Sequence, residues 1–205
     1  MIVIETKVPI VEWEELASNY SKTIESYGTF RLRPFSFETD LEQLHEWVNL
    51  PYAKYWQLEN STLEVVRSTY QEIIDGGSTT VLMGEFNGKT VFLMELYYVP
   101  EDRVSEHFSP DINDYGFHIL VGPSDNPVKG FTANIFSFIM EFMFSNKKVQ
   151  RIVVEPDIEN EKIHVLNKKA GFRYQNIINF PEKQAYLAFC TRNDFHLSEV
   201  YQLTN

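Results

Sequence analysis

A histidine and an aspartate in the second half of the chain have the chemistry of a proton-transfer pair. His118 lies in the segment 115–121, where strand alternation places it on the face opposite the aromatic residues. Asp157 directly follows the next predicted strand, and neighbouring parallel strands would bring both side chains to the same end of a sheet. Each residue also has a structural alternative. His118 would be a satisfied core histidine, and Asp157 would cap a helix that starts near Glu159.

A turn containing glycine precedes an apolar helix and is a candidate phosphate site. The loop 122–130 is rich in Pro and Gly and leads into a helix with aromatic residues at helical spacing. Backbone N–H groups point outward at a helix start, and the helix dipole adds partial positive charge there. The candidate residues are Lys129, Gly130, Phe131 and Thr132. The alternative is an ordinary surface loop.

A carboxylate interrupts the otherwise apolar strand 91–97. Glu95 is costly to bury unless a cation meets it, so it is a candidate for binding an amine. Together with the aromatic residues Trp56 and Tyr97, Glu95 forms a candidate pocket for this amine. The alternative is a salt bridge from Glu95 to Arg31 or Arg33.

Hydrophobic periodicity predicts the elements that position these residues. Strands are expected over 29–35, 79–86, 90–99, 115–121, 151–155, 172–180 and 184–192, with a hairpin turn at Asn87-Gly88. Capping boxes at 39–42 and 61–64 open two helices, and two more are expected from 131 and over 160–170. This order predicts an α/β fold with a central mixed, mostly antiparallel sheet flanked by helices on both faces.

The N-terminal segment has its own apolar pattern. Trp13, Leu16, Ala17, Tyr20, Ile24 and Tyr27 recur at helical spacing before Gly28. We therefore expect a helical arm over 1–28 and a single domain over 29–205. The aromatic stripe of the arm fits a cover over the sheet and equally fits pairing with a second subunit, so both monomer and homodimer stay open.

Composition excludes several classes of protein. The 205 residues include 18 basic and 29 acidic side chains, a net charge of −11, which disfavours nucleic acid as a partner. No apolar run is long enough to span a membrane, and the first residues do not resemble a signal peptide. The single cysteine, Cys190, and the scattered histidines give no metal-site spacing. We expect a cytoplasmic protein that binds no metal.

The chain resembles the GNAT acyltransferase superfamily, and within it the siderophore-biosynthesis branch of aerobactin- and rhizobactin-type acetylases. The likeness covers about residues 30–195. It rests on Arg33-Pro34, Leu44-His45-Glu46-Trp47, Trp56, Glu95-Leu-Tyr97, Gly116-Phe-His118, the run Arg-Ile-Val-Val-Glu-Pro-Asp at 151–157, and Asn160.

This resemblance implies an acetyl-CoA or other acyl-CoA co-substrate, with His118 and Asp157 as the catalytic pair. The resemblance also implies a cofactor site that uses the strand at Ile119, Leu120 and Val121 together with Asn160 and Asn167. The chain departs from the superfamily at two points. The phosphate loop keeps only Gly130 of the usual glycine pattern. Asn167 stands where many members have a tyrosine acid, and an amide cannot supply that proton.

The sequence thus predicts an N-acyltransferase that acylates an N-hydroxylated lysine, ornithine or diamine to a hydroxamate. An adjacent hydroxyl lowers the pKa of an amine below the ordinary value of about 10.4, so a histidine is an adequate base for such an acceptor. Two alternatives remain. One is the same chemistry on another amine, such as an aminoglycoside, and the other is a CoA-binding module without catalysis.

Overall fold

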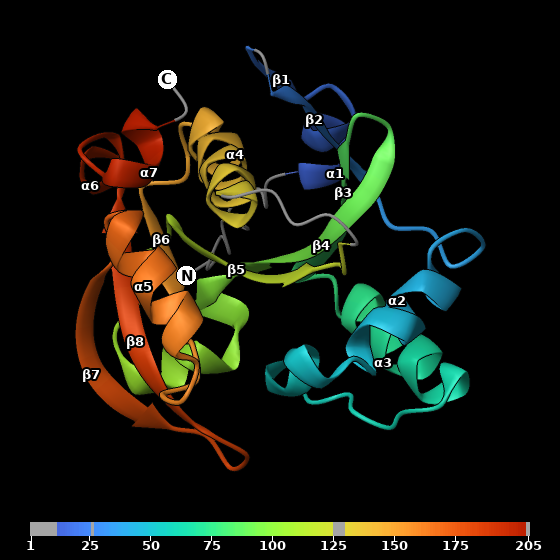
Figure 1. Ribbon diagram of the computed structural model, residues 1–205. Helices are drawn as coiled ribbons and strands as arrows, with labels where there is room; N and C mark the ends of the chain where they lie inside the picture. The colour runs from blue at the N-terminus through green and yellow to red at the C-terminus, as the bar shows by residue number, and fades with distance from the viewer. Residues whose placement is uncertain (1–11, 26, 125–129, 204–205) are drawn as a thin grey trace, which may run out of the picture.

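An eight-stranded sheet organises the part of the chain that the computed structural model describes, residues 12–25, 27–124 and 130–203 (Figure 1). The strand order is β1-β2-β3-β4-β5-β6-β8-β7, and within these residues the only parallel pair is β5 with β6. The strands are β1 Ser21–Ile24, β2 Gly28–Pro34, β3 Thr79–Phe86, β4 Lys89–Tyr98, β5 Asp114–Val121, β6 Arg151–Val154, β7 Arg173–Asn179 and β8 Gln184–Thr191. The predicted mixed, mostly antiparallel sheet is confirmed.

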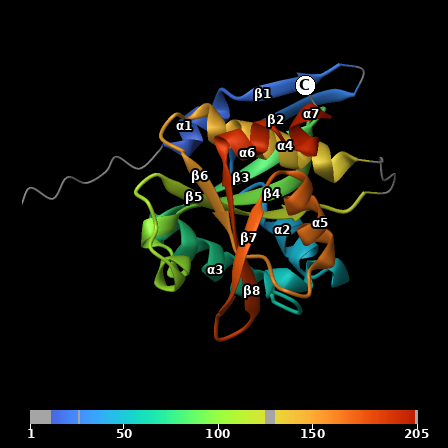
Figure 2. The ribbon, with the colours of Figure 1, turned by 90° about the vertical axis from the view of Figure 1, so that its left-hand side faces the viewer.

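Helices cover both faces of this sheet (Figures 1 and 2). One core contains residues of α1, α4 and α6, and the other contains residues of α2 and α3. The helices are α1 Trp13–Ser18, α2 Leu41–Val48, α3 Leu63–Gly76, α4 Phe131–Ser145, α5 Glu161–Lys169, α6 Arg192–His196 and α7 Glu199–Gln202. Short 3₁₀ helices are η1 Pro51–Trp56, η2 Val99–Glu101 and η3 Arg103–His107.

The parallel pairing of β5 with β6 is short. It joins residues 114–116 to residues 151–153, although β5 continues to Val121. Residues 117–121 of β5 therefore pair with β4 on one edge and lie beyond the β6 pairing on the other. This leaves an opening in the sheet directly after Gly116.

Local sequence signals located most elements correctly. The hairpin turn at Asn87-Gly88 joins β3 to β4, and both residues have positive φ, 49° and 77°. Along β5, Phe117 packs into the α4 core while Leu120 packs into the α2 core. The predicted alternation that sets His118 apart from its aromatic neighbours is confirmed.

The prediction of one helix through the N-terminal arm is wrong. Helix α1 ends at Ser18, and residues 21–24 form strand β1 against β2. The side chains of Ser18 and Asn19 donate to the carbonyls of Glu14 and Glu15 at the end of the helix. Pairing with β2 then satisfies the backbone of 21–24, while the apolar residues still pack on the α4 core. Residues 1–11 lie outside the described chain, and the division into arm and domain stays a prediction.

The two predicted capping boxes are also wrong in detail. Asp40 is the N-cap of α2, but its carboxylate binds the guanidinium of Arg33 through two hydrogen bonds of 2.7 Å. Helix α3 begins one residue later than expected, with the Thr62 side chain accepting from Val65 N–H. In both cases the residue after the predicted cap occupies the N-cap position, but only Thr62 makes a side-chain capping hydrogen bond.

Two searches of the described residues gave negative results. None of their helices combines the length and apolar character that crossing a bilayer requires. No group of three or more His, Cys, Asp or Glu side chains among them is arranged to hold a metal ion.

Candidate active site

A cavity of about 610 Å³ opens where β5 and β6 separate. Three consecutive residues of β5, Phe117, His118 and Ile119, line it. Consecutive strand residues point to opposite faces of a sheet, so the cavity reaches both faces through the opening beside β5. The cavity also contains many of the predicted site residues: Trp56, Glu95, Tyr97, His118, Ile119, Asp157, Asn160 and Asn167.

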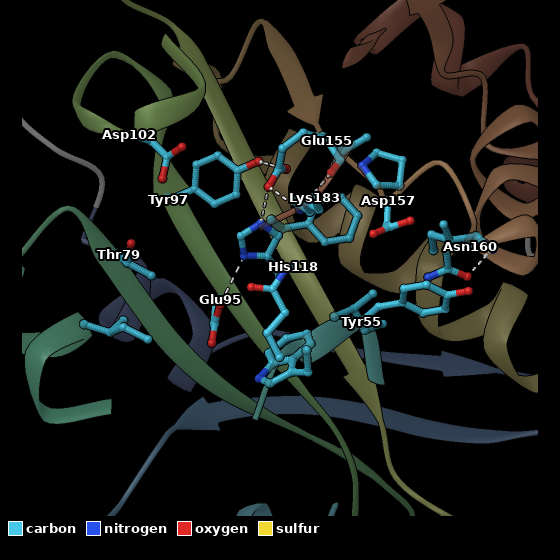
Figure 3. Close-up of a pocket in the computed structure, with 18 of the residues that line it drawn as sticks. Tyr55, Thr79, Glu95, Tyr97, Asp102, His118, Glu155, Asp157, Asn160 and Lys183 are labelled. Carbon is cyan, nitrogen blue, oxygen red and sulfur yellow. Dashed lines mark hydrogen bonds and ion pairs between the residues drawn. The ribbon is translucent and has the colours of Figure 1, made fainter. Parts of the chain in front are cut away.

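His118 lies between two carboxylates (Figure 3). Its Nδ1 is 3.1 Å from Glu95 Oε2, and its Nε2 is 2.9 Å from Glu155 Oε1. Glu95 is directly opposite His118 in the register of β4 and β5. Glu155 follows the last residue of β6, and continuing the β5–β6 register by two residues places it opposite His118 as well. The three side chains thus form a row across neighbouring strands, the Glu95–His118–Glu155 row.

Burial differs along this row. The side chains of Glu155 and Glu95 are 4% and 11% exposed, whereas the His118 side chain is 38% exposed. Two buried carboxylates need a compensating cation. The sequence-based alternative of an ion pair from Glu95 to Arg33 is wrong, because Arg33 pairs with Asp40 and Glu85.

The row changes the charge state of its members. Burial alone would lower the pKa of His118, but the charge and hydrogen bonds of Glu155 and Glu95 outweigh it and raise that pKa from 6.5 to about 10. Burial would raise the pKa of Glu155, yet the neighbouring His118 and Lys183 charges hold it well below its ordinary value. At neutral pH the resting site contains an imidazolium ion between carboxylates.

Tyr97 and Lys183 hold Glu155 in place. The Tyr97 hydroxyl is 3.0 Å from Glu155 Oε2 and 3.1 Å from the carbonyl of Val153. Its ring crosses directly over Gly116, where an added Cβ would lie 2.1 Å from Tyr97 Cζ. Lys183 donates to the backbone carbonyl of Glu155 at 3.1 Å. A glycine at 116 is therefore required for Tyr97 to reach across β5 to Glu155.

The aromatic side of the cavity comes from Trp56 and Tyr70. Trp56 Nε1 donates to the Tyr70 hydroxyl at 2.9 Å, and its ring contacts His118 edge-on with centroids 6.3 Å apart. Burial, followed by the charge of Glu95, raises the pKa of Tyr70. Both rings thus cover the Glu95 end of the row. Trp56, Glu95 and Tyr97, predicted as acceptor-binding residues, all line this cavity.

Asp157 lines the same cavity but has different partners from those expected (Figure 3). Its Oδ1 accepts from the backbone N–H of Glu159 at 2.8 Å in a local turn before α5, so the capping alternative is wrong, because the N-cap of α5 is Asn160. Both ring nitrogens of His118 bind other carboxylates. The catalytic roles of His118 and Asp157 stay predictions, while the hydrogen bonds of His118 point to Glu155 as its partner.

The predicted cofactor residues that the structure describes fall into three groups. Ile119, Asn160 and Asn167 line the cavity, with Asn160 also capping α5 through a bond from Ile163 N–H. Gly130 is the N-cap of α4 with φ of 82°, Phe131 packs into the α4 core, and Thr132 is exposed. Leu120 is buried in the α2 core, and the carbonyl of Val121 accepts from the Tyr52 hydroxyl at 2.9 Å. Lys129 lies outside the described residues.

Sequence reasoning missed Glu155 and Lys183. The sequence carried no signal for Glu155 as a partner of His118, because the register of Gly116 with Val153, which brings residues 118 and 155 together, joins strands that are distant in the sequence. Lys183 carried no signal either. It lies in the turn between β7 and β8, 28 residues along the chain from Glu155, and only the fold brings the two together.

Comparison with known proteins agrees with this architecture. A family model described as an acetyltransferase (GNAT) domain matches residues 36–180. The chain is 26% identical to an N(6)-hydroxylysine O-acetyltransferase of Escherichia coli, with 88% of this chain and 57% of that protein aligned. It is 24% identical to an N-hydroxyputrescine acetyltransferase of Acinetobacter baumannii, over 87% of this chain and 85% of that protein. The chain thus spans little more than half the length of the E. coli relative.

Solved structures share the fold. A crystal structure of an uncharacterized protein from Bacillus halodurans has a TM-score of 0.82 at 25% identity and covers 89% of this chain and 94% of its own. A crystal structure of an aminoglycoside acetyltransferase in complex with coenzyme A has a TM-score of 0.72 at 24% identity and covers 82% and 97%. The predicted fold class is therefore confirmed.

Proposed function

Because this chain belongs to the GNAT acetyltransferase family, we propose that it transfers an acyl group from acyl-CoA to an N-hydroxylated lysine, ornithine or diamine. The product is a hydroxamate of the kind used to build siderophores. Two relatives whose names specify acetyltransfer to hydroxylysine and to hydroxyputrescine support this acceptor class. The position of His118 between the carboxylates of Glu95 and Glu155, at 3.1 Å and 2.9 Å, is the observation that carries the proposal.

An imidazolium ion cannot remove a proton from an acceptor. At pH 7 an ordinary amine with a pKa of about 10.4 is neutral in only about one molecule in 2,500. Such an amine needs a free base before it can attack, and His118, with its pKa raised to about 10, already holds its proton. The electron-withdrawing hydroxyl makes a hydroxylamine largely neutral when it arrives, so it needs no prior deprotonation. The resting charge state therefore favours an N-hydroxylated acceptor.

The proton has to leave the nitrogen after attack. The nitrogen lone pair forms the C–N bond at the thioester carbonyl, the C–S bond breaks, and the proton lost from nitrogen finally resides on sulfur as the free thiol. The intermediate nitrogen is positively charged and acidic, so a carboxylate is a sufficient first acceptor of that proton. The backbone of β5 beyond Gly116, which is not paired with β6, is available to polarise the carbonyl oxygen.

Glu95 fits the role of this first proton acceptor better than Glu155. The carboxylate of Glu155 is bound by His118, Tyr97 and Lys183, and its pKa is strongly lowered, which makes it a weak base. Glu95 is more exposed and carries fewer hydrogen bonds. His118 then acts as the fixed cation that orients the Glu95 carboxylate.

An acceptor panel tests the proposal. We expect thiol release from acetyl-CoA with N-hydroxylysine, N-hydroxyornithine or N-hydroxyputrescine to exceed that with each unhydroxylated parent by about a thousandfold at pH 7, following the neutral fractions of the amines. Equal rates with lysine, or a faster rate with kanamycin, would favour another amine. Transfer to another amine is the alternative function, and it is supported by four acidic residues that line the cavity: Glu95, Asp102, Glu155 and Asp157. If no acceptor gives turnover, the alternative of a CoA-binding module without catalysis would be favoured.

The pH dependence separates the two possible roles of His118. If its charged form is required, kcat/KM for a hydroxylamine is constant around neutral pH and falls as the pH rises through about 10, where the ring loses its proton. Glu155→Gln removes the carboxylate that raises this pKa most, so the fall should move to lower pH in that variant. A rate that instead increases with pH up to about 10 would make neutral His118 the base.

A further inference from the structure

Asp102 brings a carboxylate to the cavity without a basic partner. This half-buried residue is the N-cap of η3, and its Oδ1 accepts from the backbone N–H of Val104 at 2.8 Å. No basic side chain of the described residues forms an ion pair with it. Burial, assisted by the charge of Glu155, raises the pKa of Asp102 above its ordinary value. A partly desolvated carboxylate is stabilised by a cation, so Asp102 is a place for a positively charged group of a ligand.

The basic side chains that line the cavity already have acidic partners. Among the described residues these side chains are Arg103, His118 and Lys183. His118 binds two carboxylates, and Lys183 Nζ lies 3.4 Å from Glu155 Oε1. Arg103, although it is next to Asp102 in the sequence, pairs with Glu182 at 2.6 Å and stacks on the Phe180 ring. Within the described part of the cavity, a carboxylate of a ligand therefore meets no free cation, whereas an ammonium group meets Asp102.

Asp102 lies beyond Tyr97, one of the predicted acceptor-binding residues. The Tyr97 ring lies against His118, with ring centroids 4.9 Å apart. Burial, followed by the charges of Glu155 and Asp102, raises the pKa of the Tyr97 hydroxyl, so both carboxylates lie close to this ring. Figure 3 shows Asp102 beside Tyr97, whereas Asp157 lies on the other side of the Glu95–His118–Glu155 row. An acceptor whose nitrogen reacts beside this row therefore reaches Asp102 by extending along Tyr97.

The candidate acceptors differ at the end remote from the hydroxylamine. N-hydroxyputrescine ends there in an ammonium group. N-hydroxyornithine has the same chain and the same ammonium group, with a carboxylate added on the carbon that bears it. The ammonium group of either molecule compensates the charge of Asp102. The added carboxylate would lie beside Asp102, where like charges repel and the basic side chains of the described lining residues are engaged. The cavity therefore favours the diamine.

We propose that Asp102 binds the remote ammonium group of an N-hydroxylated diamine and so makes the enzyme select a diamine over an amino acid. This inference rests on the proposed function and narrows its acceptor to one class. Asp102 is a specificity residue, since it contacts the acceptor away from the reacting atoms. The ammonium group is bound equally before and during the reaction, so loss of this contact raises KM and leaves kcat nearly unchanged.

Kinetics of Asp102→Asn test this role. The substitution keeps an oxygen that can accept from Val104 N–H and removes the charge. With N-hydroxyputrescine and saturating acetyl-CoA, we expect KM to rise about tenfold to a hundredfold and kcat to stay within about twofold. N-butylhydroxylamine has the same chain without the ammonium group, so its KM should be the same in both enzymes. Glu101→Gln, which removes an exposed carboxylate of the neighbouring η2, is the matched control and should change neither KM.

The wild type itself tests the selectivity. We expect kcat/KM for N-hydroxyputrescine to exceed that for N-hydroxyornithine at least about tenfold, and this preference should vanish in Asp102→Asn. If the Asn variant does not fold, Asp102→Ser repeats the test with a side chain that still caps η3. A wild type that prefers N-hydroxyornithine, or a folded variant with an unchanged KM for N-hydroxyputrescine, would overturn the role of Asp102 and leave the proposed function standing. Failure of every hydroxylamine to react with the wild type would instead overturn the proposed function, and this inference with it.

Discussion

Replacing Glu95 by Gln is expected to lower kcat with a hydroxylamine acceptor by ~10²–10⁴-fold. The substitution preserves size, and the Gln oxygen can still accept from His118 Nδ1, which is 3.1 Å from the present carboxylate. What is lost is the negative charge and the ability to receive the proton from the attacking nitrogen. Initial rates of thiol release at saturating acetyl-CoA measure the effect.

Glu155→Gln is the matched control for this experiment. It also removes one carboxylate from His118, but Glu155 is the more buried of the two and is bound by Tyr97 and Lys183. We expect a smaller loss of kcat than for Glu95→Gln, with a lowered pKa of His118. A Glu95→Gln enzyme with near-normal turnover would exclude Glu95 as the proton acceptor. A more severe loss in Glu155→Gln would transfer the role to Glu155.

The second large effect is expected at His118 itself. His118→Ala removes the cation shared by Glu95 and Glu155, and the two carboxylates then lose the partner that orients them. We expect a loss of ~10²–10⁴-fold in kcat. Because His118 and Glu155 act as one unit, the double variant with Glu155→Gln should lose about as much as His118→Ala alone, and not the product of the two losses. Circular dichroism and thermal melting establish that each variant is folded.

Asp157→Asn distinguishes the two possible partners of His118. Asp157 binds the backbone of Glu159, so its effect should multiply with that of His118→Ala. The pair expected from the sequence, His118 with Asp157, would be supported by the opposite result. In that case the double variant of His118 and Asp157 loses no more kcat than one single variant, while the losses of the His118 and Glu155 variants multiply. The same set of rates therefore decides between Asp157 and Glu155 without a ligand-bound structure.

The elements that needed only local information were predicted well. The Asn87-Gly88 turn and the strand alternation around His118 depend on residues within one turn or one strand. The apolar spacing gave a wrong prediction in the N-terminal segment, where a helix and a strand can both bury the same apolar residues. Tyr20 and Ile24 fit a helical stripe, yet β2 offered hydrogen bonds to the backbone of 21–24, and strand β1 buries the same side chains.

The sequence by itself determined which face of its strand carries His118, that Glu95 needs a cationic partner, and that no proton can come from Asn167. These conclusions follow from the chemistry of a residue type and from the alternation of side chains between the two faces of a strand. Only the tertiary structure decided which carboxylates reach His118, since that depends on the register between strands that are distant in the sequence. The charge of His118 followed from the same arrangement. Burial lowers the pKa of His118 and the two neighbouring carboxylates raise it. The effect of the carboxylates is the larger one because they lie within 3.1 Å of the ring nitrogens.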